Sequence, residues 1–445
     1  MSDAGKRRCA GAALVWVLAA WSTIGGSLGA CASDEPSPDL IDAGSPIDAT
    51  RDETEAVRRD AVTMIAAGGF HTCAIVAGAA KCWGGNGSGQ LGIGKLSERE
   101  PAPTPVAGLP APLAIVAGYI HTCALTSGGR ASCWGSNAVG QLAYDPASPS
   151  TDCAGPPCKS SPVSVDGVTN VSDLSLGFAT SYALVQGVVN AWGNSGYGEL
   201  GPARDGGPTF SPGVVPFVGA VSEVHAGGFF ACARMAADGS VWCWGNNGEG
   251  ELGPEASDGG VSIAPHPTPV QIPGLVGSLA LAVGIEHACA VRGDKSVVCW
   301  GSNAYAPGQP GGQLGHAPSM DPACQSASPC NPLPTPVAGI TSARSLALGN
   351  FHSCAVLDDD TVQCWGTKIN GALGHDPETD SSQAVASPKP VTGLTNVARI
   401  SAGHYHTCAL TRDEQVLCWG DNGYGQLGNA TPTTYSFSPL PVSGL

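Results

Sequence analysis

The chain has 445 residues, of which 63 are Gly and 36 are Pro, and its formal net charge is −16. Only 13% of the residues are charged and 6% are aromatic, which excludes a coiled coil and a basic nucleic-acid-binding protein. The hydrophobic fraction of 42% is sufficient for a core, and the frequent Gly and Pro predict short segments separated by turns, as in all-β proteins. The 18 cysteines indicate an oxidising compartment outside the cytoplasm.

The first 31 residues have the pattern of an export signal. Three basic residues at positions 6–8 precede an uncharged run, and residues 28–31 read Leu-Gly-Ala-Cys. This ending resembles the bacterial lipobox. The resemblance implies that residues 1–31 are a lipoprotein signal peptide and that Cys31 is lipidated and becomes the mature N-terminus.

Two other interpretations of this segment stay open. Residues 30–32 read Ala-Cys-Ala, which also fits a signal-peptidase site and would give a freely secreted protein. The uncharged run over 9–32 is also long enough to span a bilayer. We favour export to the bacterial cell envelope, at the outer membrane or the cell surface, with the lipid as the sole membrane contact.

Residues 32–62 are predicted to form a flexible tether. They are rich in Pro and acidic residues, poor in apolar residues, and share no pattern with the rest of the chain. Such a composition cannot bury enough apolar surface to fold by itself. The tether would separate a folded domain over 63–445 from the membrane.

That domain contains seven copies of one unit. The last copy is the most regular: residues 403–410 read Gly-His-Tyr-His-Thr-Cys-Ala-Leu, and Cys-Trp-Gly at 418–420 and Gly-Gln-Leu-Gly at 425–428 follow. The Trp of the Trp-Gly marker recurs about every 56 residues, at Trp83, Trp134, Trp192, Trp244, Trp300, Trp365 and Trp419. A period of this length indicates a repeat architecture.

Short alternating runs within each unit predict four β-strands separated by Gly-rich turns. Seven such units match the blades of a β-propeller. A linear solenoid is the alternative, but it would need atypical capping units at its ends, and here the last unit is as regular as the first.

The pattern Gly-x-x-His-x-x-Ala-Leu, Trp-Gly, Gly-Gln-Leu-Gly and Pro-x-x-Val resembles the regulator of chromosome condensation repeat. The resemblance covers residues 64–445 and implies a seven-bladed propeller. The third unit departs most, because Thr180, Ser181 and Tyr182 replace His-Thr-Cys and Ala191 replaces the Cys before Trp192. Eukaryotic relatives act on a nuclear GTPase and chromatin, a compartment that an exported protein does not enter. The secreted bacterial beta-lactamase inhibitor with the same propeller is a closer analogy.

Twelve cysteines recur as pairs spaced by nine to eleven residues, which suits opposed positions on neighbouring strands of a hairpin. The predicted pairs are Cys73 with Cys82, Cys123 with Cys133, Cys232 with Cys243, Cys289 with Cys299, Cys354 with Cys364, and Cys408 with Cys418. The third unit lacks both cysteines together, as a covalent pair predicts. Two further pairs, Cys153 with Cys158 and Cys324 with Cys330, are expected to link inserted loops. Zinc would require four clustered ligands, so we predict disulfides, with no metal and no cofactor.

Five histidines, each two residues before a blade cysteine, occupy one position of the repeat: His71, His121, His287, His352 and His406. Ring symmetry should keep them too far apart to share an ion, so we predict buried histidines bonded to neighbouring backbone groups. No nucleophile elbow, phosphate loop or zinc-protease motif is present in the sequence. We therefore do not expect an enzyme.

The units vary most after Gly-Gln-Leu-Gly, where insertions of up to about 20 residues occur, and all of these should emerge on one propeller face. Tyr144, Phe210 and Met320 in these insertions are the candidate binding residues. We predict a monomeric, non-catalytic binding or scaffold module whose loops engage a protein. The alternatives are a lectin-like propeller that binds a carbohydrate or cell-surface polymer, and a hydrolase with dispersed loop residues. The acidic charge argues against nucleic acid as a partner.

Overall fold

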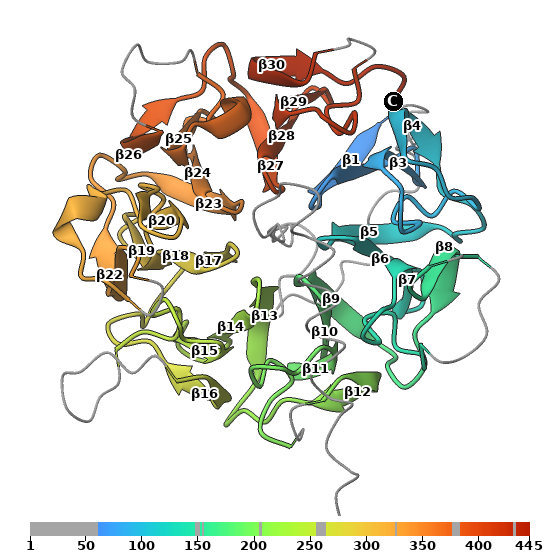
Figure 1. Ribbon diagram of the computed structural model, residues 1–445, viewed down its shortest axis with the longest axis horizontal. Helices are drawn as coiled ribbons and strands as arrows, with labels where there is room; N and C mark the ends of the chain where they lie inside the picture. Colours follow the sequence, from blue (N-terminus) through green and yellow to red (C-terminus); the bar gives the residue numbers. More distant parts are fainter. Residues whose placement is uncertain are drawn as a thin grey trace, which may run out of the picture.

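Each of the seven repeats folds into a four-stranded antiparallel sheet, and the seven sheets surround a central axis (Figure 1). The computed structural model describes residues 61–146, 152–153, 155–203, 207–254, 264–324, 327–375, 383–429 and 433–445. This architecture confirms the predicted all-β, seven-bladed propeller and excludes the solenoid. The predicted signal peptide with Cys31, and the tether up to residue 60, lie outside the described residues. Within the described part of the chain, no helix is long and apolar enough to cross a membrane.

The strands of each blade follow one another in the chain. Blades 1 to 3 comprise β1 (Val62–Ala67), β2 (His71–Val76), β3 (Ala79–Gly85), β4 (Arg99–Pro105); β5 (Pro112–Ala117), β6 (His121–Thr126), β7 (Arg130–Ser136), β8 (Cys158–Ser164); β9 (Val171–Leu176), β10 (Thr180–Val185), β11 (Val188–Gly193) and β12 (Thr209–Val214). Blades 4 and 5 comprise β13 (Val221–Ala226), β14 (Phe230–Met235), β15 (Val241–Gly245), β16 (His266–Gln271); β17 (Ala280–Val283), β18 (His287–Val291), β19 (Val297–Ser302) and β22 (Cys330–Pro336). Blades 6 and 7 comprise β23 (Ala343–Leu348), β24 (His352–Leu357), β25 (Val362–Thr367), β26 (Ala384–Pro390); β27 (Val397–Ala402), β28 (His406–Thr411), β29 (Val416–Asp421) and β30 (Tyr435–Pro441).

We call the four strands of a blade A to D from the axis outward. The innermost A strands are β1, β5, β9, β13, β17, β23 and β27, which surround the central axis in Figure 1. Blade 5 carries an additional hairpin, β20 (Ala304–Ala306) with β21 (Gln309–Pro310), and a 3₁₀ turn, η1 (Pro318–Met320), between its C and D strands. A second 3₁₀ turn, η2 (Ile369–Gly371), follows β25.

The ring closes without exchange of a strand between its two ends. Blade 1 uses β1–β4 and blade 7 uses β27–β30, and the two blades lie side by side (Figure 1). Ile65 and Trp83 of blade 1 pack in one buried cluster with Leu410 of blade 7, and the backbone N–H of Ala67 donates to Ser401 Oγ at 2.9 Å. Non-covalent contacts therefore hold the closing seam.

A ring of seven glycines lets the innermost turns approach one another. These glycines are Gly68, Gly118, Gly177, Gly227, Gly284, Gly349 and Gly403, each at the end of an A strand. A Cβ at any of them would lie within 3.0 Å of the carbonyl oxygen of the corresponding glycine in the next blade, and for Gly403 the next blade is the first. The repeated Gly is thus explained by close approach between blades rather than by turn geometry alone.

The predicted hairpin register is confirmed. Cys73 pairs with Cys82, and Val76 pairs with Ala79, so that only residues 77 and 78 form the turn. Both turn residues have positive φ, at 51° and 75°, as a type I′ turn requires.

All six predicted intrablade cysteine pairs form disulfides in the structure. Their Cα–Cα distances are 4.0 to 4.1 Å, slightly closer than an ideal opposed pair. Each bond joins strand B to strand C of its own blade, between Cys73 and Cys82, Cys123 and Cys133, Cys232 and Cys243, Cys289 and Cys299, Cys354 and Cys364, and Cys408 and Cys418. The bonds join directly opposed residues of the two strands, as predicted, and the two backbones lie slightly closer than the separation of roughly 4.5–5.5 Å expected for such residues.

Candidate binding face

The two ends of the propeller differ in the length of their connections. Strands A and C run in one direction in every blade, so the A–B and C–D connections emerge at one end, which we call the loop face. The B–C turns at the opposite face have two to five residues, whereas the C–D connections have 13 to 27. All of the insertions seen in the sequence belong to the C–D connections, so they lie on the loop face.

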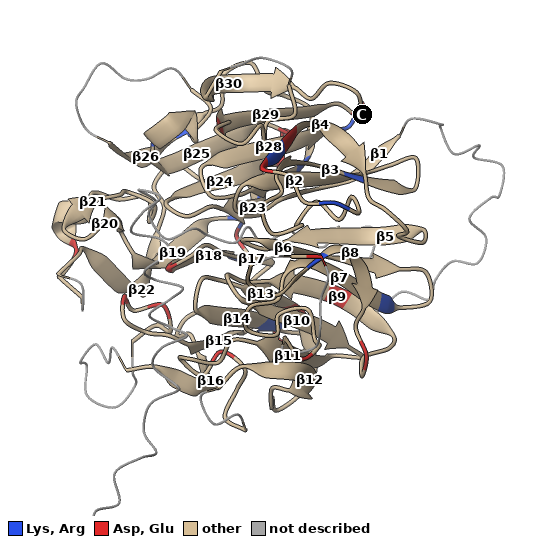
Figure 2. Cartoon of the chain, turned by 45° about the vertical axis from the view of Figure 1, so that its right-hand side comes forward, with Lys and Arg blue, Asp and Glu red and all other residues tan. Residues whose placement is uncertain are grey.

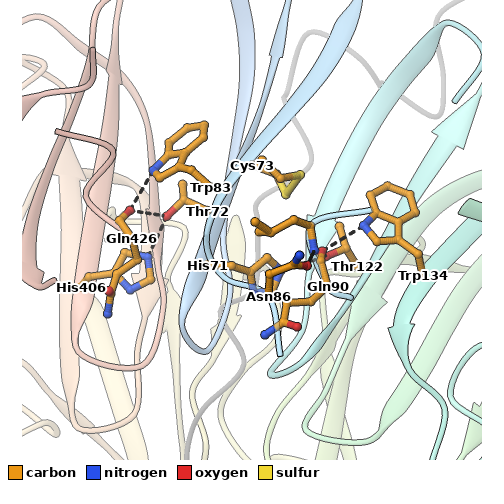
Figure 3. Close-up of a disulfide and its surroundings, with 12 residues drawn as sticks. His71, Thr72, Cys73, Trp83, Asn86, Gln90, Thr122, Trp134, His406 and Gln426 are labelled. Atoms are coloured by element: carbon orange, nitrogen blue, oxygen red, sulfur yellow. Dashed lines mark hydrogen bonds between the residues drawn. A yellow bond between two sulfur atoms is a disulfide. The ribbon is translucent and has the colours of Figure 1, made fainter. Parts of the chain in front are cut away.

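A repeated hydrogen-bonded clamp holds the start of each C–D connection against the next blade (Figure 3). Thr122 Oγ1 of blade 2 donates to the Gln90 carbonyl of blade 1 at 2.8 Å, and Trp134 Nε1 donates to the same oxygen at 2.9 Å. His71 Nε2 lies 2.8 Å from Thr122 Oγ1. Because the hydroxyl proton goes to the carbonyl, the histidine must be the donor and carries its proton on Nε2.

The clamp recurs at four other seams, including the one that closes the ring. There Thr72 and Trp83 donate to the Gln426 carbonyl, both at 2.9 Å, and His406 Nε2 contacts the Thr72 hydroxyl. The corresponding His–hydroxyl pairs at the remaining seams are His121–Ser181, His287–Ser353 and His352–Thr407, at 2.9 to 3.0 Å. The expected partner was a backbone group. The structure corrects this, because the partner is a Thr or Ser hydroxyl on the next blade.

These five histidines are neutral. Burial is the largest cause that lowers their pKa values, to about 3 for His71, His121, His287 and His406 and to about 4 for His352. A neutral, buried imidazole that donates to a hydroxyl does not exchange protons near neutral pH. The histidines therefore join blades, as the sequence analysis expected of a structural role.

Blade 3 replaces the missing clamp hydroxyl with a tyrosine. Blade 4 has Ala231, and blade 5 has Ala288, where the other five blades have Thr or Ser. The buried Tyr182, which stands at the position of the absent cysteine, donates its hydroxyl to the Glu199 carbonyl at 2.8 Å. Trp244 Nε1 donates to the same oxygen at 2.7 Å. The tyrosine thus takes the place of a disulfide cysteine, and it also makes the hydrogen bond to the Glu199 carbonyl that Ala231 of blade 4 cannot make.

The Gln of the Gly-Gln-Leu-Gly motif caps its own turn, and two blades use Glu instead. Gln90 Oε1 accepts from the Ser88 N–H at 2.9 Å, and Glu199 Oε2 accepts from the Tyr197 N–H at 2.7 Å. Burial raises the pKa of Glu199 to about 7, and burial likewise raises the pKa of Glu251 to about 7. The buried position therefore favours an uncharged side chain, such as the amide of Gln, over the ionised carboxylate of Glu.

We expect Glu199→Gln and Glu251→Gln to stabilise the protein at high pH. The folded-state pKa of about 7 exceeds the ordinary value of 4.5, so the protonated form favours folding, and this contribution is lost as the pH rises through 7. Each substitution should add up to about 3 kcal/mol to the free energy of unfolding at pH 8 and little at pH 5. Urea denaturation at both pH values measures the difference. Glu100→Gln is the control, because a hydrogen bond from Lys95 lowers the pKa of Glu100 and the same change should not stabilise at pH 8. Equal effects at pH 5 and pH 8 would contradict the assignment.

An arc of aromatic side chains lies around the central axis on the loop face. It comes mostly from the A–B turns, which join each innermost strand to its neighbour. We call it the aromatic collar. Its members are Phe70, Tyr119, Phe178, Phe229, Phe351, His404 and Tyr405 in A–B turns, with Tyr197 and Tyr424 in C–D connections.

Each ring of the collar contacts another. Tyr119 stacks on Phe178 with centroids 4.6 Å apart, and His404 stacks on Tyr405 at 4.1 Å. Phe70 joins these pairs, at 5.3 Å from Tyr119 and 4.9 Å from His404. The contacts Phe70–Tyr424, Phe178–Phe229, Tyr197–Phe229 and Phe351–Tyr405, at 5.1 to 5.9 Å, extend the arc over six blades.

The collar is a rigid platform with partly exposed rings. Its buried members are Tyr119, Phe178, Phe351 and His404, while Phe70, Phe229, Tyr405 and Tyr424 are half-buried and Tyr197 is 37% exposed. Backbone hydrogen bonds connect neighbouring A–B turns, from Gly69 N to Gly118 O at 3.1 Å and from Gly228 N to Ile285 O at 2.9 Å. Binding to such a surface orders few groups, so it costs little conformational entropy.

Sequence reasoning missed the collar because it treated the residues between Gly and His as variable. The signal was present, since an aromatic residue directly precedes His71, His352 and His406. Two Gly-Tyr-Gly sequences, around Tyr197 and Tyr424, belong to the same pattern. Only the ring geometry shows that these residues meet.

The arc of rings is interrupted at blade 5 by carboxyl groups. Glu286 takes the place that Phe70 and Phe229 have in their turns, and Glu249 takes the place of Tyr197 and Tyr424. Burial, then repulsion from Glu251 and from Glu249, raises the pKa of Glu286 to about 8. We call Glu249, Glu251 and Glu286 the acidic gap.

The predicted binding residues are not among the collar residues: Tyr144 and Met320 lie in the C–D connections of blades 2 and 5, and Phe210 lies in the D strand of blade 3. Met320 is 75% exposed in η1, and Phe210 is 36% exposed but belongs to strand β12 rather than to a loop. Tyr144 is half-buried, packs against the core of blades 2 and 3, and has Lys159 Nζ 5.6 Å from its ring centroid. Disulfides join Cys153 to Cys158 and Cys324 to Cys330 within these connections.

One group of potential metal ligands occurs among the described residues. A carboxylate oxygen of Glu249 and the sulfurs of Cys324 and Cys330 lie within 4.8 Å of one another. Both sulfurs belong to a disulfide, so they offer no thiolate to a metal. The group therefore does not form a metal centre.

Comparisons with known proteins agree with this geometry. A family model described as an RCC1-like domain matches residues 23–397, and one for the regulator of chromosome condensation (RCC1) repeat matches residues 397–426. The ultraviolet-B receptor UVR8 of Arabidopsis thaliana is 26% identical over 389 residues, which cover 86% of this chain and 81% of UVR8. The E3 ubiquitin-protein ligase HERC2 of Homo sapiens is 30% identical over 257 residues, 56% of this chain but 5% of HERC2. The solved structure of yeast RCC1 (Prp20) bound to Kap60 has a TM-score of 0.68 at 22% identity and covers 82% of this chain and 83% of its own. This last likeness shows the fold alone.

Proposed function

Because the chain belongs to the RCC1-like family, we propose that it is a non-catalytic binding module that engages a protein partner through its loop face. The contrast between the two faces carries the proposal. The loop face has the C–D connections of 13 to 27 residues and the aromatic collar, whereas the opposite face has hairpin turns of two to five residues at its B–C positions. Variable loops on a rigid scaffold are where binding usually occurs.

Relatives with this propeller bind other proteins, which supports the proposal. The yeast RCC1 structure contains Kap60, and a second structure of Prp20p from Saccharomyces cerevisiae was described with its binding to Gsp1p and histones. In the chain described here, the five repeated histidines serve contacts between blades. Basic and acidic positions are spread over the blades in the view of Figure 2.

The proposal locates the module at the bacterial cell envelope, anchored by a lipid on Cys31. Strand β1 runs toward the loop face, so its first residue, Val62, lies at the opposite face near the axis. A tether that joins the propeller there leaves the loop face uncovered. A partner would thus approach from the side of the collar and the long connections.

A site-specific crosslinking experiment tests both parts of the proposal. A photoreactive amino acid at Met320, on the loop face, should give a discrete, saturable crosslinked protein in intact cells. The matched control is Val218, which is 99% exposed in the connection between β12 and β13 on the opposite face and should give none. Equal crosslinking from both positions, or crosslinking from Val218 alone, would contradict the loop-face proposal.

In the same cells, Cys31→Ser should move the protein from the membrane fraction to the soluble fraction. An unchanged distribution between the two fractions would contradict the lipid anchor.

A carbohydrate or cell-surface polymer is the second candidate. The observation in its favour is the set of half-buried rings, Phe70, Phe229, Tyr405 and Tyr424, because sugars pack against aromatic faces. The seven repeated tryptophans do not contribute, since all are fully buried. A saturable crosslink to glycan rather than to protein at Met320 would favour this candidate.

A further inference from the structure

The half-buried rings of the collar and the half-buried Glu286 lie around the central axis on the loop face, and Glu249 and Glu251 are buried close to Glu286. Ile285, beside Glu286, packs in a cluster with Phe351, and Tyr405 packs against this cluster from blade 7. On the other side, the backbone of Gly228, beside Phe229, bonds to the Ile285 carbonyl. Blades 1 to 4, 6 and 7 thus contribute aromatic rings, and blade 5 contributes the carboxyl group of Glu286 between them.

Two positions that face each other across a seam both change from an aromatic to a carboxyl side chain. Where Tyr424 meets Phe70, and where Tyr197 meets Phe229, the ring centroids are 5.1 and 5.4 Å apart. At the seam between blades 4 and 5, the equivalent positions hold Glu249 and Glu286. Two neighbouring carboxyl groups in aromatic surroundings favour a cation placed between them, because a cation relieves their mutual repulsion.

We propose that the collar and the acidic gap bind a cationic chain segment of the partner. One Lys or Arg side chain of this segment contacts Glu286, and the neighbouring side chains of the segment lie along the aromatic rings. Aromatic faces and carboxylates are the two groups that recognise ammonium and guanidinium ions. The net charge of −16 attracts a basic partner to the surface and raises the rate of encounter. The inference rests on the proposed function and narrows it to a partner with basic side chains.

The charged groups that act on Glu286 are all acidic. Every cause that shifts the pKa of Glu286 raises it, as expected for a carboxyl group that faces other carboxyl groups. His404, the one imidazole in the collar, is neutral because burial lowers its pKa to about 3.

Cation binding to this surface should release a proton. Free Glu286, with a pKa of about 8 next to Glu249 and Glu251, is protonated at pH 7, and a bound cation favours its ionised form. The pKa in the complex is therefore lower than in the free protein. By linkage, affinity rises with pH until the pH exceeds about 8 and then becomes constant.

Fluorescence anisotropy with a labelled peptide of alternating Lys and Gly tests the inference on the full mature chain. At low salt, affinity should increase from pH 6.5 to pH 8.5, while a peptide of alternating Glu and Gly should not bind. Glu286→Gln should weaken binding about tenfold at pH 8.5 and abolish the pH dependence. Phe70→Leu should weaken it about threefold at all pH values, because a cation–π contact is lost.

Asp166→Asn is the matched control. Asp166 is an exposed carboxylate in the connection between β8 and β9, on the opposite face, so its loss removes the same charge without touching the collar. Equal binding by wild type, Glu286→Gln and Asp166→Asn would mean unspecific attraction to the acidic protein and would overturn the inference. A chitin oligosaccharide could also displace the labelled peptide. If this displacement required Phe70 but not Glu286, the surface would bind carbohydrate and the inference would be overturned. The Met320 crosslink decides the loop-face proposal separately, since a partner without basic side chains would still crosslink there.

Discussion

Reduction of the six hairpin disulfides should unfold the propeller at room temperature. Each bond closes a short loop, and the loop-entropy relation gives about 3 kcal/mol of stabilisation for each. Their sum is larger than the total free energy of unfolding of a typical domain. Circular dichroism in urea, with and without a phosphine reductant, measures the effect. The native protein should resist the reductant until it unfolds, because all twelve of these cysteines are fully buried.

A single blade tests the same bonds without global unfolding. The double substitution Cys354→Ala with Cys364→Ala should lower the free energy of unfolding by about 3 kcal/mol. Blade 3 is the internal comparison, because Tyr182 and Ala191 occupy the paired positions there and no disulfide is lost on reduction. Thiol titration of the denatured, unreduced protein should detect almost no free cysteine. A count of about a dozen thiols would contradict the disulfide assignment.

Trp83→Ala should destabilise the seam that closes the ring. Trp83 is fully buried between blades 1 and 7 and donates to the Gln426 carbonyl at 2.9 Å. Removal of a buried indole leaves a cavity and costs about 3 to 5 kcal/mol. No peptide bond crosses this seam between β30 and β1, so the loss should also increase local opening. Urea denaturation measures the first effect, and hydrogen exchange in β1 and β28 measures the second.

Two variants control for the loss of an indole. Trp242→Ala removes a partly exposed indole whose Nε1 donates to Ser240 Oγ at 3.1 Å, and it should cost clearly less. Trp365→Ala removes an equally buried indole at the seam of blades 5 and 6, which the chain itself crosses. It should cost a similar free energy without the local opening. Equally fast hydrogen exchange at both seams would contradict the expectation that the seam of blades 7 and 1, which has only non-covalent contacts, opens more easily than the seam that the chain crosses.

The repeat made most of the fold predictable from the sequence. A period of about 56 residues with one Trp-Gly marker per unit indicates the number of blades. The spacing of Cys73 and Cys82 predicts their register, because a two-residue turn permits only one pairing. These features depend on contacts within about ten residues, where spacing alone restricts the geometry.

The candidate site was less predictable, because its residues come from different blades. Phe70 and His404 are far apart in the sequence, and no periodicity within a unit shows that their rings lie 4.9 Å apart. Tyr182 was recognised as a departure from the repeat, but its hydrogen bond to the Glu199 carbonyl depends on the absence of a hydroxyl at Ala231 in the next blade. The replacement of two aromatic residues by glutamates at blade 5 has a meaning only when the neighbouring turns are known to meet.

Length and composition by themselves determined an all-β protein rich in turns, and the cysteine spacing determined one disulfide in each of six blades. The sequence could do this because strands and hairpins follow from local periodicity and turn length. The tertiary structure alone decided what the loop face presents, how the ring closes and which hydroxyl each histidine contacts. Those features arise where repeats meet across a seam, and contacts of that kind are set by packing between blades rather than by the order of residues within one.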